Sequence, residues 1–139
     1  MIEIIVYGTP APQGSKRHVG KGIMIEASQK VKPWREAVKW AVRESERRMR
    51  PEVPLCVDIT FTLVKPASAP KRLRSWPMRK PDLDKLVRST FDALTESGVW
   101  QDDARVVEVN AMKCFPGEGL RALASPGAWI RIREVTVNE

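Results

Sequence analysis

A chain of 139 residues is long enough for one domain with a buried core, and its formal net charge of +7 favours a polyanionic partner such as nucleic acid. No apolar run is long enough to span a membrane, and the opening IEIIVY stretch has neither a basic leader nor the length of a secretory signal, so we expect a cytoplasmic protein. One histidine, His18, and two distant cysteines argue against a zinc site and a Cys/His nucleophile, and we predict that Cys56 and Cys114 are reduced and buried.

The first third of the chain predicts a strand, a basic loop and a helix. Ile2–Tyr7 is rich in β-branched residues, which favours a first strand. A loop broken by Pro and Gly follows, and its Lys16 and Arg17 suit a phosphate backbone, although a plain solvated loop fits equally well. We expect a short second strand at Ile23–Glu26 and a helix over Pro33–Met49, with Pro33 at its first position.

A strand and a strongly basic loop come next. Leu55–Val64 alternates between apolar and smaller or polar residues, which predicts a half-buried strand. The loop Lys65–Lys80 contains no acid and has Trp76 in its middle, a composition that suits a nucleic-acid backbone and a splayed base. The alternative is a disordered basic loop with Trp76 tucked into the core. The DNA-binding residues predicted here are Lys71, Arg72, Arg74, Arg79 and Lys80.

The stretch that follows predicts an amphipathic helix flanked by carboxylates. Apolar residues recur at three- and four-residue steps over about Leu83–Thr95, and Gly98 is typical of a helix end. Such a helix is roughly 20 Å long, and the extended residues after it cover about the same length, so the chain is able to turn at Gly98 and return. The flanking acids are Asp82 and Asp84 before the helix and Asp102 and Asp103 after it.

These carboxylates have two interpretations. A cluster of three or four suits a hard cation such as Mg²⁺, which prefers oxygen ligands. Alternatively, Asp82 simply caps the helix, Asp84 favours the helix dipole, and Asp102 and Asp103 form an ordinary polar turn. Spacing alone favours this second interpretation.

Two further strands complete the predicted fold. They cover Val106–Phe115 and Ala128–Val137, with a Gly/Pro loop between them. The order strand, strand, helix, strand, helix, strand, strand predicts a single α+β domain over residues 1–139, with two main helices packed on one face of a mixed or antiparallel sheet.

The segment Lys80–Val107 resembles the RusA family of Holliday junction resolvases. The similarity is carried by KPDLDKL, Arg88, FDALTESGVW and QDDARVV, and by the spacing between the two acidic pairs; the rest of the chain matches more loosely, including the order of its elements. This combined motif is far more specific than any single DxD, and it reverses the preference for a capping role.

The resemblance implies a Mg²⁺-dependent crossover junction endodeoxyribonuclease, with Mn²⁺ as a possible substitute, that acts as a homodimer on four-way DNA junctions in recombination and repair. Asp82, Asp84 and Asp103 look like the family's metal-binding carboxylates, and Asp102 aligns with the neighbouring acid. Catalytic roles also fall to Arg88, where the family commonly has lysine, and to Lys85, where asparagine is frequent. Related sequences are often carried by phages or prophages, which places the protein in a bacterial cytoplasm without membrane partners.

Three alternatives stay open. A non-catalytic nucleic-acid-binding protein fits the charge, but it has no use for carboxylates that repel phosphate unless metal is present. A Mg²⁺ nuclease for flaps, forks or nicked duplex has the same cluster, since the carboxylates fix the chemistry and not the substrate. A degenerate family member that binds junctions without cutting them is compatible with the departures at Arg88 and Lys85.

Overall fold

The computed structural model describes the backbone of residues 1–13 and 21–136 and the side chains of residues 1–13 and 29–136. Its main helices and strands follow one another in the predicted order, apart from one strand discussed below. In chain order the elements are β1 (Ile2–Tyr7), α1 (Lys21–Ser45), β2 (Leu55–Thr62), α2 (Leu83–Ser97), the short 3-10 helix η1 (Asp103–Arg105), β3 (Val106–Cys114) and β4 (Gly127–Glu134).

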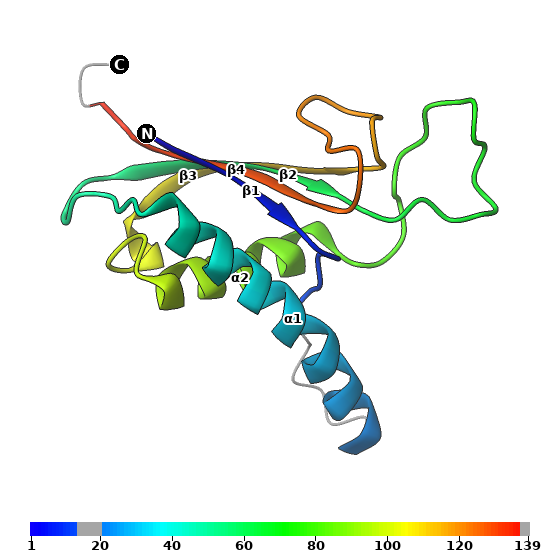
Figure 1. The fold of residues 1–139 in the computed structure, drawn as a ribbon, viewed down its shortest axis with the longest axis horizontal. Coiled ribbons are helices and arrows are strands. Elements are labelled where there is room, and N and C mark those ends of the chain that lie inside the picture. Colours follow the sequence, from blue (N-terminus) through cyan, green and yellow to red (C-terminus); the bar gives the residue numbers. More distant parts are fainter. Residues whose placement is uncertain (14–20, 137–139) are drawn as a thin grey trace.

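The four described strands form one mixed sheet in the order β1-β4-β2-β3. β4 runs antiparallel to both β1 and β2, whereas β2 and β3 are parallel, with α2 in the crossover between them. Both long helices lie on the same face of this sheet (Figure 1). The predicted α+β fold, with two helices on a mixed sheet, is therefore confirmed.

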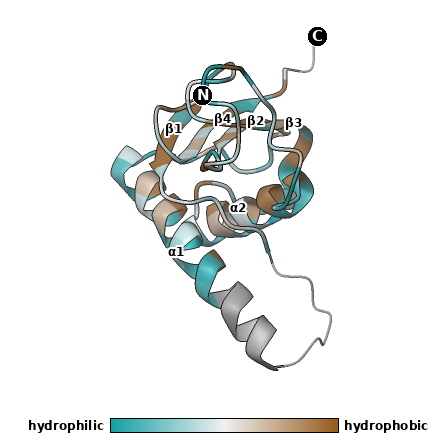
Figure 2. Cartoon of the chain, turned by 90° about the vertical axis from the view of Figure 1, so that its right-hand side faces the viewer, coloured by the Kyte–Doolittle hydropathy of each residue, from teal (hydrophilic) through white to brown (hydrophobic). Residues whose placement is uncertain are grey.

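The hydrophobic core fills the layer between the sheet and the two helices, where Figure 2 shows apolar segments of both facing one another. Strand residues such as Ile59 and Ile130, which are paired in register, pack there against Val38 of α1 and Leu86 of α2. Trp34 is also fully buried, and its indole nitrogen donates a hydrogen bond of 3.1 Å to the Thr90 hydroxyl. This bond joins α1 to α2 and satisfies the only polar atom of the tryptophan ring.

One predicted element is wrong. The residues 23–26 are not a strand, because α1 begins at Lys21 and continues through Pro33 to Ser45. Two β-branched residues in a short stretch gave the strand signal, but no turn residue separates that stretch from the helix, so the helix extends through it. α1 also ends at Ser45, four residues before the predicted end at Met49. The next residue, Glu46, has a left-handed backbone with φ 54°.

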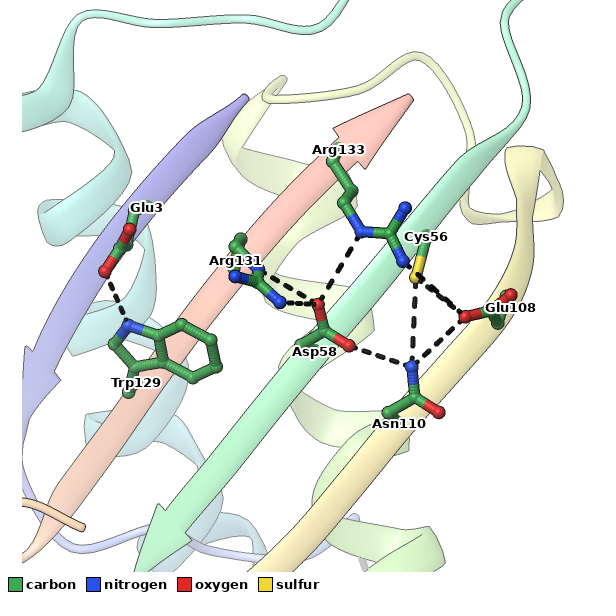
Figure 3. Close-up of polar contacts among 8 residues, drawn as sticks. All are labelled: Glu3, Cys56, Asp58, Glu108, Asn110, Trp129, Arg131 and Arg133. Carbon is green, nitrogen blue, oxygen red and sulfur yellow. Dashed lines mark hydrogen bonds and ion pairs between the residues drawn. The ribbon is translucent and has the colours of Figure 1, made fainter. Parts of the chain in front are cut away.

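The opposite face of the sheet carries a polar network (Figure 3). Asp58 of β2 accepts hydrogen bonds of 2.9 and 3.0 Å from Arg131 of β4 and one of 2.8 Å from Asn110 of β3. Burial raises the pKa of Asp58, but these hydrogen bonds and the positive charges of Arg131 and Arg133 outweigh it and lower the pKa below its usual value. The network therefore ties three neighbouring strands together through one ionised carboxylate.

Both cysteines lie on this polar face and are free and buried, as predicted. Burial, followed by the hydrogen bond to Glu108, raises the pKa of Cys56 to about 11, so its thiol is neutral near pH 7. No helix in the described residues is long and apolar enough to cross a membrane.

Candidate active site

The start of α2 presents a carboxylate that the helix itself does not use. Asp82 occupies the N-cap position with extended backbone, yet its side chain makes no capping hydrogen bond. Its Oδ2 atom instead lies 3.2 Å from Nζ of Lys85, and the side chain is 49% exposed. The alternative interpretation, in which Asp82 simply caps the helix, is therefore wrong. Its exposed carboxylate, paired only with Lys85 among the described side chains, is accessible to a ligand from solvent.

The backbone leading into Asp82 is held by a lysine that the sequence interpretation did not single out. Nζ of Lys113, near the end of β3, donates hydrogen bonds of 2.8 Å each to the carbonyl oxygens of Arg79 and Pro81. The only sequence signal was the position of this lysine on the apolar face of a predicted strand, where a charged residue needs partners. Lys113 thus fixes the segment that positions Asp82.

A second anchor joins the loop after β1 to the same helix. The Ser89 hydroxyl donates a hydrogen bond of 2.6 Å to the backbone carbonyl of Ala11, and the backbone N–H of Gln13 donates one of 3.2 Å to the backbone carbonyl of Lys85. The loop after β1, the start of α2 and the end of β3 therefore meet around Asp82.

One face of α2 carries alternating charges. Asp84, Arg88 and Asp92 are four residues apart and therefore lie along the same side of the helix. Asp84 and Arg88 are exposed, and neither forms an ion pair with any residue whose side chain is described. Both are available for a ligand, and the guanidinium of Arg88 is suited to phosphate oxygens.

The second acidic pair lies after the helix. Gly98 ends α2 as predicted, in a left-handed conformation with φ 80°, and the chain turns there toward η1. Asp102 caps η1, since its Oδ1 accepts a hydrogen bond of 3.0 Å from the Ala104 amide. Burial, then the hydrogen bond and charge of Asp102 and the charge of Asp92, raise the pKa of Asp103.

The single chain does not gather its predicted metal ligands at one point. Asp82 and Asp84 lie at the start of α2, whereas Asp102 and Asp103 follow its end at η1. Within the described side chains, no group of three or more Asp, Glu, Cys or His is close enough to hold a metal ion. The turn at Gly98 is as predicted, whereas the metal-binding roles of the four acids stay predictions.

The basic loop before Asp82 is ordered by an acid outside it. Glu118 accepts a hydrogen bond of 2.7 Å from Lys65 and another of 2.9 Å from the Ser75 amide, and these lower its pKa. Trp76 is 48% exposed and lies under the Arg74 guanidinium, 4.3 Å from the ring centre, so it is not tucked into the core. The other loop residues predicted to bind DNA are exposed as well: Lys71, Arg72, Arg79 and Lys80.

The predicted contacts of Lys16 and Arg17 lie outside the described residues. The remaining predicted residues surround α2 and the loop that leads into it.

The family model described as "Endodeoxyribonuclease RusA" matches residues 7–123. The chain belongs to the RusA family. The match includes α2, both acidic pairs and the basic loop before Asp82. RusA family proteins are endodeoxyribonucleases, so this chain is a nuclease that hydrolyses DNA.

Individual RusA proteins support the assignment over long and short alignments. The chain is 27% identical over 112 residues to a crossover junction endodeoxyribonuclease RusA from Aquifex aeolicus, which covers 81% of this chain and 79% of that protein. It is 51% identical over 35 residues to the proteins of the same name from Enterobacteria phage 82 and Escherichia coli K12, covering 25% of this chain and 29% of each.

Proposed function

We propose that this RusA family protein resolves four-way DNA junctions by paired symmetric nicks in recombination and repair, with Mg²⁺ or Mn²⁺ as its cofactor. The observation that carries the proposal is the carboxylate of Asp82 at the start of α2, which is exposed, makes no capping hydrogen bond and lies two residues before Asp84. Carboxylates placed among basic loops weaken DNA binding unless a cation lies between them and the phosphate, so their presence argues for metal-dependent cleavage.

The donor set fits a hard cation. The carboxylate of Asp82 makes no capping bond and pairs only with Lys85 among the described side chains, and that of Asp84 has no described ion pair. Their oxygen atoms are therefore open to a cation, and Asp103 is the third acid expected to take part. A Mg²⁺ ion held by these carboxylates would supply an activated water for attack on phosphorus and would neutralise charge on the phosphate.

The protein's own basic residues then act on the substrate. Exposed Arg88 grips a non-bridging phosphate oxygen and stabilises the charge that grows there, a role for which its fixed positive charge suffices without proton transfer. Lys85 balances the charge of Asp82 before DNA arrives, as their 3.2 Å contact indicates. Lys71, Arg72, Arg74, Arg79 and Lys80 bind flanking phosphates, so affinity falls steeply with salt.

A homodimer is part of the proposal. Two symmetric nicks require two sites, and a two-fold dimer matches the near two-fold symmetry of a junction. The lack of a three-acid cluster among the described side chains of one chain adds a second reason, because Asp103 of a second chain is able to complete a site that one chain leaves open.

The test is a gel assay with a labelled synthetic four-way junction and a matched linear duplex, each with Mg²⁺ and with EDTA. Symmetric, ligatable nicks in the junction alone, and only with Mg²⁺, are the expected result. Junction binding without cutting in Mg²⁺ or Mn²⁺ would instead favour a non-catalytic member. Equal cutting of both substrates would keep the metal chemistry and remove the junction preference.

A further inference from the structure

The basic loop between β2 and α2 also carries large apolar side chains that are open to solvent. Within six residues, Leu73 is 68% exposed, Trp76 48% and Met78 89%. Figure 1 shows this loop projecting beyond the end of the sheet. Exposed apolar side chains that are gathered in one segment mark an interaction site more often than scattered ones do.

The backbone around Trp76 is held in place by the protein itself. Glu118 accepts a hydrogen bond of 2.7 Å from Lys65 and one of 2.9 Å from the backbone N–H of Ser75. The backbone N–H of Met78 donates a further bond of 2.9 Å to the carbonyl of Trp76. Bonds on both sides therefore fix the backbone that presents the indole ring, which lowers the entropy cost of a contact made by that ring.

Trp76 borders a cavity of about 480 Å³. Apolar residues make up much of the lining, including Pro66 and the buried Phe115. The same cavity is lined by Lys80 and Pro81, the two residues directly before Asp82. A group that contacts Trp76 in this cavity therefore lies beside the segment that leads into the proposed catalytic carboxylates.

The charge of the loop selects a polyanion as the partner of this surface. Residues 65–80 contain six Lys and Arg residues and no acid, so a second copy of the loop would be repelled. DNA, on which the RusA family acts, combines negative phosphates with flat apolar base faces. The Arg74 guanidinium lies 4.3 Å from the centre of the Trp76 ring and covers one of its faces, which leaves the opposite face for a base.

We propose that Trp76 stacks on a base exposed at the branch point of the DNA, while the cations of the loop hold the phosphates on either side. This inference rests on the proposed function for the junction as substrate, and it assigns part of the choice of branched over linear DNA to one residue. The cost of unstacking a base is least where the stack is already broken, as it is at a branch point. Because every base has a π face, such stacking selects the branch without selecting a sequence.

Equilibrium binding to a four-way junction and to a matched linear duplex, both in EDTA, tests the proposal. Trp76→Leu keeps apolar bulk but removes the aromatic face, so it should weaken junction binding by about tenfold and duplex binding by less than about twofold. Trp76→Phe keeps a ring and should bind the junction within about threefold of the wild-type affinity. Trp40→Leu is the matched control, because Trp40 is a 63% exposed tryptophan of α1, outside the loop, and both affinities should stay unchanged.

Thermal melting of the three variants shows whether they fold. Equal losses of junction and duplex affinity for a folded Trp76→Leu would overturn the proposal, since the ring would then not distinguish the branch. An equal loss of junction affinity for Trp40→Leu would overturn it as well, because the effect would not belong to the loop.

The fluorescence of 2-aminopurine reports the stacking itself. With this base beside the branch point, wild-type protein should quench the fluorescence in EDTA, and Trp76→Leu should quench it less; with the base in the middle of an arm, the two proteins should give the same signal. Identical quenching beside the branch point by both proteins would overturn the stacking proposal and leave junction cleavage intact. The expected difference without any cutting in Mg²⁺ would support the stacking and contradict the proposed cleavage.

Discussion

Nζ of Lys113 lies 2.8 Å from the carbonyl oxygen of Pro81, one residue before the first predicted metal ligand. Together with the equal bond to Arg79, this contact fastens the entry of α2 to the end of β3. Lys113→Met removes the Nζ donor, and with it both hydrogen bonds, but keeps most of the apolar side chain. We expect cleavage to slow by about tenfold with junction affinity changed less than about twofold, because misplacement by a fraction of an ångström affects chemistry more than phosphate contacts.

Single-turnover rates and filter binding measure the two quantities for Lys113→Met. Lys71→Met is the matched control, since Lys71 is exposed in the basic loop and is predicted to contact only phosphate. The control should weaken binding and leave the rate at saturating protein unchanged. If Lys113→Met instead weakens junction binding and leaves the cleavage rate unchanged, Lys113 does not position Asp82.

Asp82→Asn should abolish cleavage and leave junction binding equal or tighter, because it removes a metal ligand and a negative charge. The carboxylate makes no capping bond, so stability should change by less than about 0.5 kcal/mol. Cleavage assays, binding assays and thermal melting together measure this. Equal loss of binding and stability would assign Asp82 a structural role.

Asp102→Asn provides a comparison within the second acidic pair. Asparagine keeps the side-chain oxygen that accepts from the Ala104 amide, so the start of η1 should remain capped. Any loss of cleavage would then report the missing charge. We expect a smaller loss of cleavage for Asp102→Asn than for Asp103→Asn, which should be as inactive as Asp82→Asn. Equal cleavage rates for Asp102→Asn and Asp103→Asn would contradict the prediction that Asp103 is the metal ligand of this pair.

Arg88→Lys should retain substantial cleavage, because a lysine at this place keeps a positive charge near the phosphate. Arg88→Met, which keeps length without charge, should lose about 100-fold or more. Rates at saturating Mg²⁺ measure both. If Arg88→Lys is as inactive as Arg88→Met, the planar guanidinium itself is required.

Glu118→Gln should loosen the basic loop, because Glu118 holds both Lys65 and the Ser75 amide. The substitution adds one unit of positive charge, which alone would tighten DNA binding. Weaker binding, by about threefold, would therefore show that loop order outweighs charge. Glu44→Gln, the same charge change on the exposed side of α1, controls for electrostatics and should bind DNA equally or more tightly.

Asp58 should make stability sensitive to acid. Its pKa is lowered in the folded state, so its contribution is present above the unfolded value of about 3.9 and is lost as pH falls through the folded pKa. Asp58→Ala should lower the free energy of unfolding by about 1–3 kcal/mol at pH 7, because Arg131 loses its partner, and by less at pH 2. Urea unfolding at both pH values measures the difference. An equal loss at pH 2 and pH 7 would mean that packing, not charge, explains it.

The sequence was informative wherever a local pattern carries its own physics. The strand β2, the apolar stripe of α2 and the stop at Gly98 are each decided by a few neighbouring residues, and the structure confirms these elements. The predicted half-burial of β2 is wrong, because Cys56, Thr60 and Thr62 on its second face are buried as well. The strand predicted at residues 23–26 was wrong because two isoleucines indicate a strand only if turn residues separate them from the following helix, and none does here.

The site was harder to predict because its geometry depends on distant segments. Nothing local connects Lys113 to Pro81, or Gln13 to Lys85, and both pairs form only when the sheet has assembled. Chain length showed that the two acidic pairs were able to meet, but the described side chains of one chain hold no group of three acids close enough for a metal ion, and the spacing does not contain the packing that decides this.

The position of β4 has a consequence for the protein's synthesis. β4 is the last described strand of the chain, yet it lies between β1, the first, and β2. Until residues 127–134 have left the ribosome, β1 has no partner strand and β2 has only its parallel neighbour. The sheet therefore forms only after residues 127–134 have been translated, and a premature stop codon before residue 127 would yield a chain that is recognised and degraded as unfolded.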